Sequence, residues 1–170
     1  EALRAMSAKF LGHAVSFAVL GIYWVGHHNQ MLHIRRHDRP FLWLTILFLL
    51  CVASMPFPTG LLIRYNDQQL PVLIYSSLLI ATGASLDLMW WYATKNHHLV
   101  NPGLDPQFIR TVHRRILTAP LFYLVAAAVS FLSVRLSEVI FALTAAYYIV
   151  PSLGWLHAFD WHHHRNIHKT

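Results

Sequence analysis

Charged side chains are scarce in this chain of 170 residues. Asp, Glu, Lys and Arg together make up 12% of it, whereas a soluble domain averages about 25%. Hydrophobic residues make up 56%, and the mean hydropathy is +0.43. So few charges cannot cover the outside of a water-soluble fold, which argues against a soluble domain, a disordered chain and a fibre. A single cysteine, Cys51, excludes an internal disulfide scaffold.

Five long runs contain no Asp, Glu, Lys or Arg at all. They are residues 10–34, 40–63, 68–86, 116–134 and 139–159. A helix needs about 20 mostly apolar residues to cross a bilayer. The runs predict membrane-spanning helices at about 8–29, 40–63, 70–94, 109–134 and 137–159. In lipid each segment must satisfy its own backbone polar groups, so we expect an all-α, polytopic membrane protein.

The connections between these runs are short, which predicts one transmembrane domain over residues 1–170. The second run is apolar on nearly every face, unlike the alternating strands of a membrane barrel. Pro56 and Pro58 lie late in this run, and we expect the helix to kink or end there. Pro120 and Pro151 should bend the later spans.

Basic residues are distributed unequally between the two sides that these spans define. The net charge is +6, which often indicates nucleic-acid binding, but here the basic residues flank spans and act as topology determinants. One side holds nine of them: Arg35, Arg36, Arg39, Lys95, Arg110, Arg114, Arg115, Arg165 and Lys169. The other side holds four: Arg4, Lys9, Arg64 and Arg135. We therefore expect a cytoplasmic C-terminus, and five spans then place Glu1 outside, which predicts a further helix upstream of it.

Two polar features interrupt the apolar spans. Trp24 and His27 are three residues apart and share a helix face. Their spacing alone favours an interfacial position over an interior polar contact. Asp87 lies about 10 Å from the end of its span by helical rise. It is a candidate ion-pair partner of Arg114 or Arg115, or a hydrated carboxylate that reaches toward the interface.

The histidines permit two cofactor hypotheses, and both are weak. The terminal run, with His162, His163 and His164, offers imidazoles without a visible scaffold, and we predict no metal site there. His13 and His27 are fourteen residues apart, a spacing that suits two stacked haems. Each haem needs a second axial ligand, and the outer level of the other spans offers no histidine to meet His13.

Several catalytic and channel signatures are missing. The sequence contains no Thr-Val-Gly-Tyr-Gly filter, no phosphate-binding glycine loop and no Ser-His-Asp arrangement that we can place. We therefore predict that the protein is not an enzyme and binds no cofactor. Polar residues are scattered over different spans, so one subunit offers no continuous aqueous route.

Four short motifs nevertheless carry a family resemblance. They are Gly-Ile-Tyr-Trp-Val-Gly-His-His-Asn at 21–29, Pro-Phe-Pro-Thr at 56–59, Trp-Tyr-Ala at 91–93 and Asn-Pro-Gly-Leu-Asp at 101–105. With these motifs the chain resembles the bacterial side of the endolysosomal potassium channel family, the transmembrane protein 175 type. The resemblance implies a six-helix subunit, a homotetramer in bacteria, and K⁺ conduction through a filter unlike that of ordinary potassium channels.

The resemblance also assigns roles and exposes departures. It implies that Trp24 and His27 support the serine and aspartate of an Arg-then-Phe-Ser-Asp motif on the first helix, which reverses the preference drawn from spacing. That motif is absent, so the pore-lining residues are expected upstream of Glu1. Thr45 stands where the family pattern has asparagine in the supporting network.

The sequence therefore favours a potassium channel subunit in the bacterial plasma membrane, with lipid, K⁺ and further copies of itself as partners and no nucleic acid. A histidine-rich metal or proton transporter and a haem-binding membrane redox protein are the alternatives.

Overall fold

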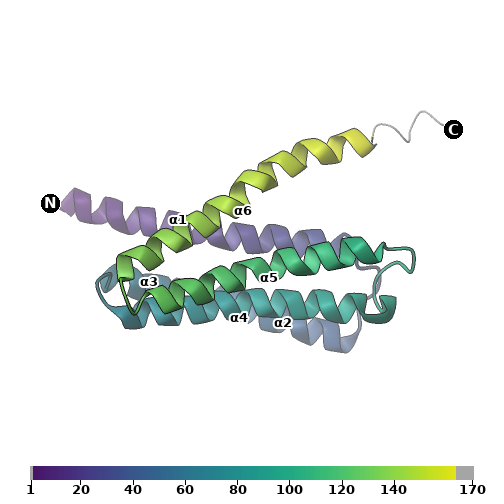
Figure 1. Cartoon of the computed structure of the whole chain (residues 1–170), viewed down its shortest axis with the longest axis horizontal. Coiled ribbons are helices and arrows are strands. Elements are labelled where there is room, and N and C mark those ends of the chain that lie inside the picture. Colours follow the sequence, from purple (N-terminus) through teal and green to yellow (C-terminus); the bar gives the residue numbers. More distant parts are fainter. Residues whose placement is uncertain (1, 164–170) are drawn as a thin grey trace.

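The protein is almost entirely helical (Figure 1). The computed structural model describes residues 2–163, and the side chains of residues 16–149. Its elements are α1 (Ala2–Met31), α2 (Arg39–Ser54), α3 (Pro56–Arg64), α4 (Gln69–Thr94), the 3-10 turn η1 (Lys95–His97), α5 (Pro106–Val129) and α6 (Val134–His163). Each predicted span overlaps with one helix for most of its length or, for residues 40–63, with the α2–α3 pair. The all-α fold is thereby confirmed.

Three helical stretches of the described part are long and apolar enough to cross a membrane. They are Arg39–Arg64, Gln69–His97 and Pro106–Val129. With 26 residues, α4 is about 39 Å long, enough for a hydrocarbon core of about 30 Å. The helices α1 and α6 form where the sequence predicts spans, and their crossing of the bilayer stays a prediction.

Prolines divide the second span as expected. Asp38 caps α2, its carboxylate accepts a hydrogen bond from the Phe41 backbone N–H, and Pro40 occupies the first turn. The helix ends at Ser54, and Pro56 opens α3 immediately after it. A proline has no N–H for the preceding turn, so the helical ladder is interrupted here. Pro120 and Pro151 both lie inside continuous helices, and any bend at them stays a prediction.

One predicted boundary is wrong. The connection expected at 135–136 lies at 130–133, between the end of α5 at Val129 and the start of α6 at Val134. Two serines form side-chain hydrogen bonds in this turn. The Ser130 hydroxyl donates to the Ala127 carbonyl (2.6 Å), and the Ser133 hydroxyl accepts from the Leu136 N–H (3.5 Å). Side-chain hydrogen bonds of this kind compete with the backbone hydrogen bonds of a helix. They therefore end α5 earlier than the apolar pattern of the sequence predicts.

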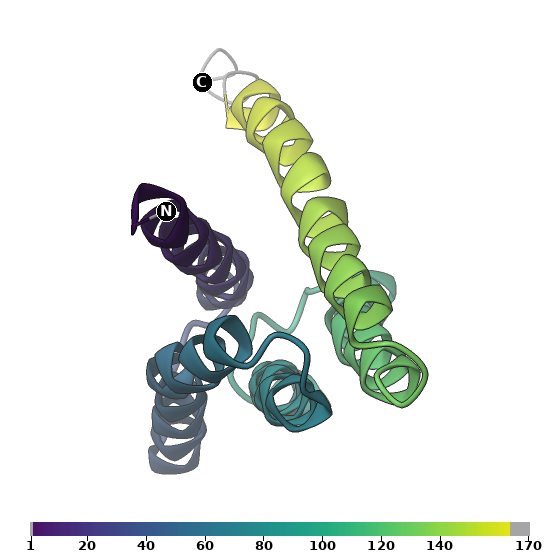
Figure 2. The same cartoon turned by 90° about the vertical axis from the view of Figure 1, so that its left-hand side faces the viewer.

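Helix α4 lies at the centre of the bundle, against α2 and α3 on one side and α5 on the other (Figure 2). Half of its most apolar stretch is buried, against 22% for each of the other two spans. Its Trp90 and Met89 are fully buried together with Phe41 and Phe48 of α2. The central helix therefore provides most of the surface against which the outer helices pack.

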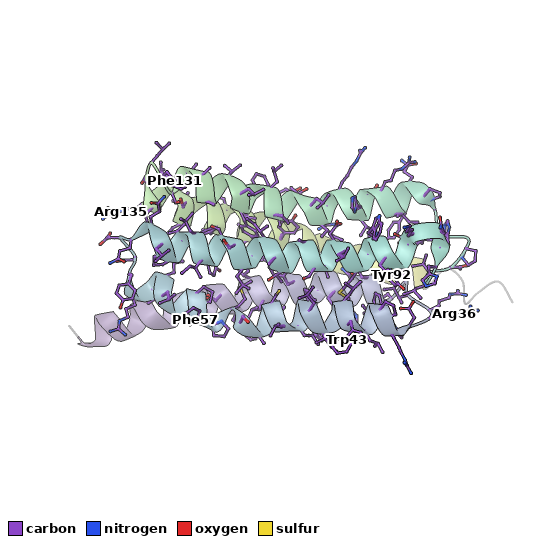
Figure 3. The ribbon with its side chains drawn as sticks, turned by 90° about the horizontal axis from the view of Figure 1, so that it is seen from below. Arg36, Trp43, Phe57, Tyr92, Phe131 and Arg135 are labelled. Atoms are coloured by element: carbon purple, nitrogen blue, oxygen red, sulfur yellow. The ribbon has the colours of Figure 1, made fainter. Side chains whose placement is uncertain are left out.

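The two ends of the bundle differ in charge. One end, which we call the basic end, comprises the loops 32–38 and 95–105 and the helix termini next to them. It holds Arg35, Arg36, Arg39, Lys95, Arg110, Arg114 and Arg115, whereas the opposite end holds Arg64 and Arg135 among the described side chains. Figure 3 shows Arg36 and Arg135 at the two extremes of the molecule. The grouping of basic residues that the sequence predicts is thus present in three dimensions.

Candidate functional site

An aromatic cluster joins α1 to α2. The His27 ring stacks on Phe48 with the ring centroids 5.1 Å apart and the planes 6° apart, and Trp24 lies 5.8 Å from the same imidazole. His27 is 9% exposed, whereas Trp24 is 59% exposed. The structure thus brings together the two residues that the sequence places on one face, and it adds Phe48, which sequence reasoning missed.

The His27 imidazole is held by packing rather than by hydrogen bonds. Its Nε2 atom is buried and has no hydrogen-bond partner. A buried polar atom without a partner costs about 1–3 kcal/mol. The atom lies inside the subunit, whereas the neighbouring Trp24 is exposed and open to a further contact.

The hydrogen bond of Thr45 does not involve this cluster. Its hydroxyl donates to the Phe41 carbonyl one turn earlier in α2 (2.9 Å). Threonine commonly satisfies itself in this way within a helix, especially in lipid. The three-residue supporting network of Trp24, His27 and Thr45 stays a prediction, because the described contacts join only the first two.

Hydrogen bonds fix α1 to the central helix. The Tyr23 hydroxyl donates to the Leu79 carbonyl (2.8 Å), and Gln30 Nε2 donates to the Leu86 carbonyl (3.1 Å). Carbonyls within a helix already accept one bond each, and their second lone pair remains available to a side chain. Ser16 extends the same pattern by donating to the Thr59 hydroxyl of α3 (3.0 Å). These bonds set the face that α1 turns toward the bundle.

Asp87 faces a histidine. Its Oδ1 lies 2.7 Å from Nδ1 of His113 on α5, and the two side chains are 14% and 39% exposed. His113 directly precedes the arginines that the sequence offered as partners. An ion pair of Asp87 with Arg114 or Arg115 stays a prediction, and the partner that the structure places at the carboxylate is the imidazole.

A second carboxylate organises the basic end. Asp38 Oδ2 accepts from the Tyr92 hydroxyl (2.7 Å) and lies 2.9 Å from His98 Nε2. Beside it, the Arg35 N–H donates to the Leu99 carbonyl (2.9 Å). The hydrogen bond from Tyr92, then those from the Phe41 N–H and from His98, hold the pKa of the Asp38 carboxyl below its ordinary value, although its partial burial opposes them. We call these contacts the Asp38 junction; they tie loop 32–38 to loop 95–105.

Sequence signals for the two carboxylate sites differ in strength. The run Asp38-Arg39-Pro40 is a helix-start pattern, a capping residue followed by proline in the first turn, and it could have revealed Asp38. Nothing in the sequence sets the register of α4 against α5, so the choice of His113 among neighbouring cations needs the structure.

The histidine hypotheses fall mostly beyond the described side chains. His13 and the terminal histidines, including His162 to His164, lie outside them. Between residues 16 and 149 no group of three or more His, Cys, Asp or Glu side chains could hold a metal ion. His27 itself is engaged by Phe48 and Trp24.

The fold and these contacts define an all-helical, polytopic membrane protein whose helices are joined by polar contacts within an apolar bundle. The chain belongs to the TMEM175 family. The family model described as endosomal/lysosomal potassium channel TMEM175 matches residues 1–56.

Relatives and a solved structure support this membership. A protein named potassium channel from Streptomyces collinus is 31% identical over 152 residues, covering 87% of this chain and 74% of the relative. A second protein of that name, from Chamaesiphon minutus, is 28% identical over 155 residues, covering 89% and 76%. The crystal structure of a lysosomal potassium-selective channel TMEM175 homolog from Chamaesiphon minutus matches with a TM-score of 0.76 at 27% identity, covering 88% of this chain and 77% of that one.

Proposed function

We propose that this chain is a subunit of a potassium-selective channel, that K⁺ is the permeant ion, and that the protein conducts ions without catalysing a reaction. Family membership supports the ion and the class, because the bacterial relatives are named potassium channels. The proposal that ions pass between subunits depends on the hydrogen-bond partners of the hydroxyl groups inside the spans.

Most hydroxyls in the described spans are satisfied within the subunit. Those of Thr45, Ser54, Ser77, Thr82, Ser85, Ser130 and Thr144 donate to carbonyls of their own helices, three or four residues back. Ser16 donates to Thr59, whereas the buried Ser76 hydroxyl has no hydrogen-bond partner. Hydroxyls bound in this way do not form a polar stripe along one helix. Among the side chains of residues 16–149, a single subunit therefore offers no continuous wet route, and we place the ion path between subunits.

Several copies are thus required, and we propose a homotetramer. The face of α1 that carries the exposed Trp24, directly above the buried His27, suits contact with an additional helix. On this proposal Trp24, His27 and Thr45 support the pore from behind rather than line it. The filter is then a ring of side chains or an apolar constriction on the symmetry axis, since no carbonyl-filter signature is present.

Flux through liposomes tests the proposal. The full-length protein is reconstituted in vesicles with a K⁺ gradient, and proton uptake through a protonophore is followed with a fluorescent dye. We expect uptake driven by K⁺ and much weaker uptake with Na⁺. Uptake against an ion gradient would indicate a coupled transporter, and a Soret band in the purified protein would indicate a haem protein; either contradicts the channel.

We further propose that the protein lies in the bacterial plasma membrane with its basic end in the cytoplasm. Cytoplasmic loops carry the excess of Lys and Arg, and the basic end holds most of the described cations. The C-terminus is then cytoplasmic, because α6 runs from the opposite end toward the side of the basic end (Figure 1).

A further inference from the structure

The outer face of α5 combines arginines with an apolar surface in one line. Steps of four and three residues place these side chains on the same side of the helix. The members are Arg110, Arg114, Leu117, Leu121, Leu124 and Val125, and we call them the α5 stripe. Both arginines are exposed, and the four apolar residues are 41–62% exposed.

The stripe faces away from the rest of the subunit. The buried residues of α5 are Ala119, Pro120, Tyr123 and Ala126, which lie on the other side of the helix. Pro120 packs against α4, and Tyr123 lies in the core against Phe141 of α6. Figure 3 shows α5 at the edge of the bundle, with side chains that project outward from it. The α5 stripe is therefore a surface that the subunit presents to its surroundings.

The dimensions of the stripe match one lipid leaflet. The apolar part of the stripe, from Leu117 to Val125, rises about 12 Å at 1.5 Å per residue. Half of a hydrocarbon core of about 30 Å is slightly thicker. Arg110 and Arg114 lie in the first three turns of α5, and their long side chains can reach the headgroups of the leaflet at the basic end if the spans cross as proposed. Apolar side chains then follow over the depth of the acyl chains.

The charge of the stripe selects the kind of lipid. The helix α5 contains no Asp or Glu, so no acidic residue of its own offsets Arg110 and Arg114. Guanidinium groups bind phosphate oxygens in a bidentate manner. A cationic pair above an apolar strip fits an amphiphile with an anionic head. We infer that the α5 stripe is a binding site for an anionic glycerophospholipid of the leaflet at the basic end.

Two arginines elsewhere provide a matched control. Arg35 and Arg36 are also exposed at the basic end, but they lie in the loop before α2 and not on the helix that carries the stripe. Replacing either pair by glutamine removes the same charge from the same end. A general surface potential would respond equally to both changes, whereas a built site responds only to the change at Arg110 and Arg114.

Native mass spectrometry of the full-length oligomer, released from vesicles of equal phosphatidylglycerol and phosphatidylcholine, measures the retained lipid. The wild type should retain phosphatidylglycerol in preference. A direct charge-assisted hydrogen bond to a phosphate oxygen contributes about tenfold or more, so Arg110→Gln/Arg114→Gln should lower the preference by an order of magnitude or more. The Arg35→Gln/Arg36→Gln protein loses only its share of the surface potential and should show a clearly smaller loss.

Other results would overturn the site. Equal losses in both double variants would indicate surface potential alone. Absence of any preference in the wild type, or a changed subunit number in Arg110→Gln/Arg114→Gln, would indicate that bulk lipid or a second copy covers the stripe. Displacement of the lipid by inorganic phosphate would indicate a site for a free anion. Arg110→Lys/Arg114→Lys keeps both charges but cannot bind phosphate in a bidentate manner, so its preference should lie between that of the wild type and that of the glutamine pair; retention of the full preference would contradict recognition by the guanidinium groups.

Discussion

Gly83 of α4 and Pro120 of α5 meet where these two helices approach closely. A Cβ atom on Gly83 would lie 2.6 Å from Pro120 Cγ, and the proline ring cannot rotate away. The small residue on one helix therefore permits the bulky, rigid residue on the other. Close approach of this kind is the main source of helix affinity in lipid, where apolar side chains gain nothing by leaving the solvent.

We predict that Gly83→Ala destabilises the subunit by about 1–3 kcal/mol through overpacking against Pro120. Thermal unfolding in detergent, followed by circular dichroism, measures the change. Gly60→Ala is the control, because a Cβ at Gly60 meets no atom within 4 Å. A Gly83 variant as stable as the Gly60 variant would show that α4 and α5 separate without cost.

The aromatic cluster on α1 gives the second prediction. Trp24→Ala and His27→Ala should lower the yield of the proposed tetramer and the K⁺ flux, because aromatic pairs such as those of His27 contribute about 0.5–1.5 kcal/mol beyond their buried area. His28→Ala is the control, since His28 is exposed on the neighbouring face. His27→Phe keeps an aromatic ring on Phe48 and removes both ring nitrogens. It should fold normally and lose tetramer, and equal behaviour of all these variants would refute the assigned face.

The Asp87–His113 contact predicts an energetic coupling between α4 and α5. Asp87→Asn, His113→Gln and the double variant form a cycle whose interaction energy should be about 1 kcal/mol, as for other contacting polar pairs. Unfolding free energies in detergent supply the values. A parallel cycle of Asp87 with His28 should give an interaction energy near zero. A similar value in both cycles would mean that the contact contributes nothing specific.

The Asp38 junction predicts that the stability of the folded protein depends on pH in the acid range. The pKa of the Asp38 carboxyl is lowered in the folded protein, so the unfolded chain binds more protons as the pH falls. The stability that it contributes is present above the ordinary value of 3.8 and is lost as the pH falls through the lower folded-state value. Tyr92→Phe removes the largest cause of the shift and should move the acid-unfolding midpoint to higher pH. Tyr65→Phe, at the opposite end, should leave the midpoint unchanged.

Orientation is tested by single cysteines in a Cys51→Ser background. With the basic end in the cytoplasm, an impermeant maleimide added to intact cells should label Arg135→Cys and not Arg36→Cys. Disrupted cells should show labelling at both positions, which controls for reactivity. The reverse pattern in intact cells would place the basic end outside.

The apolar runs were sufficient to predict the helices, because lipid leaves the backbone no other way to satisfy its polar groups. The break before Pro56 could also be predicted, since proline removes a hydrogen bond at a known place. The turn at 130–133 could not. Ser130 ends one helix and Ser133 starts the next through hydrogen bonds of their side chains. The distribution of apolar residues along the sequence contains no information about such bonds.

Only the part of the site that lies on one face of one helix could be predicted from the sequence. Spacing brings Trp24 and His27 together, because both belong to α1. Phe48 and His113 lie on other helices, and their positions depend on how far each helix is shifted along its neighbour. In an apolar bundle many shifts bury similar area, and close approaches such as that of Gly83 to Pro120 select one of them.

The junction at the basic end has a mechanical consequence. Arg35 and Leu99 are joined by their backbones, and Ile34 pairs with Val100, so the α1–α2 loop and the α4–α5 loop move as one body. In the other half of the subunit, α3 is held to α1 by the bond between the Ser16 and Thr59 hydroxyls, and among the described residues no backbone hydrogen bond joins the loops 65–68 and 130–133. The cross-links therefore differ along the membrane normal, with the two loops joined by their backbones at the basic end and not at the far end. Spin labels on the loops 65–68 and 130–133 should then show broader distance distributions than labels on the two loops of the basic end.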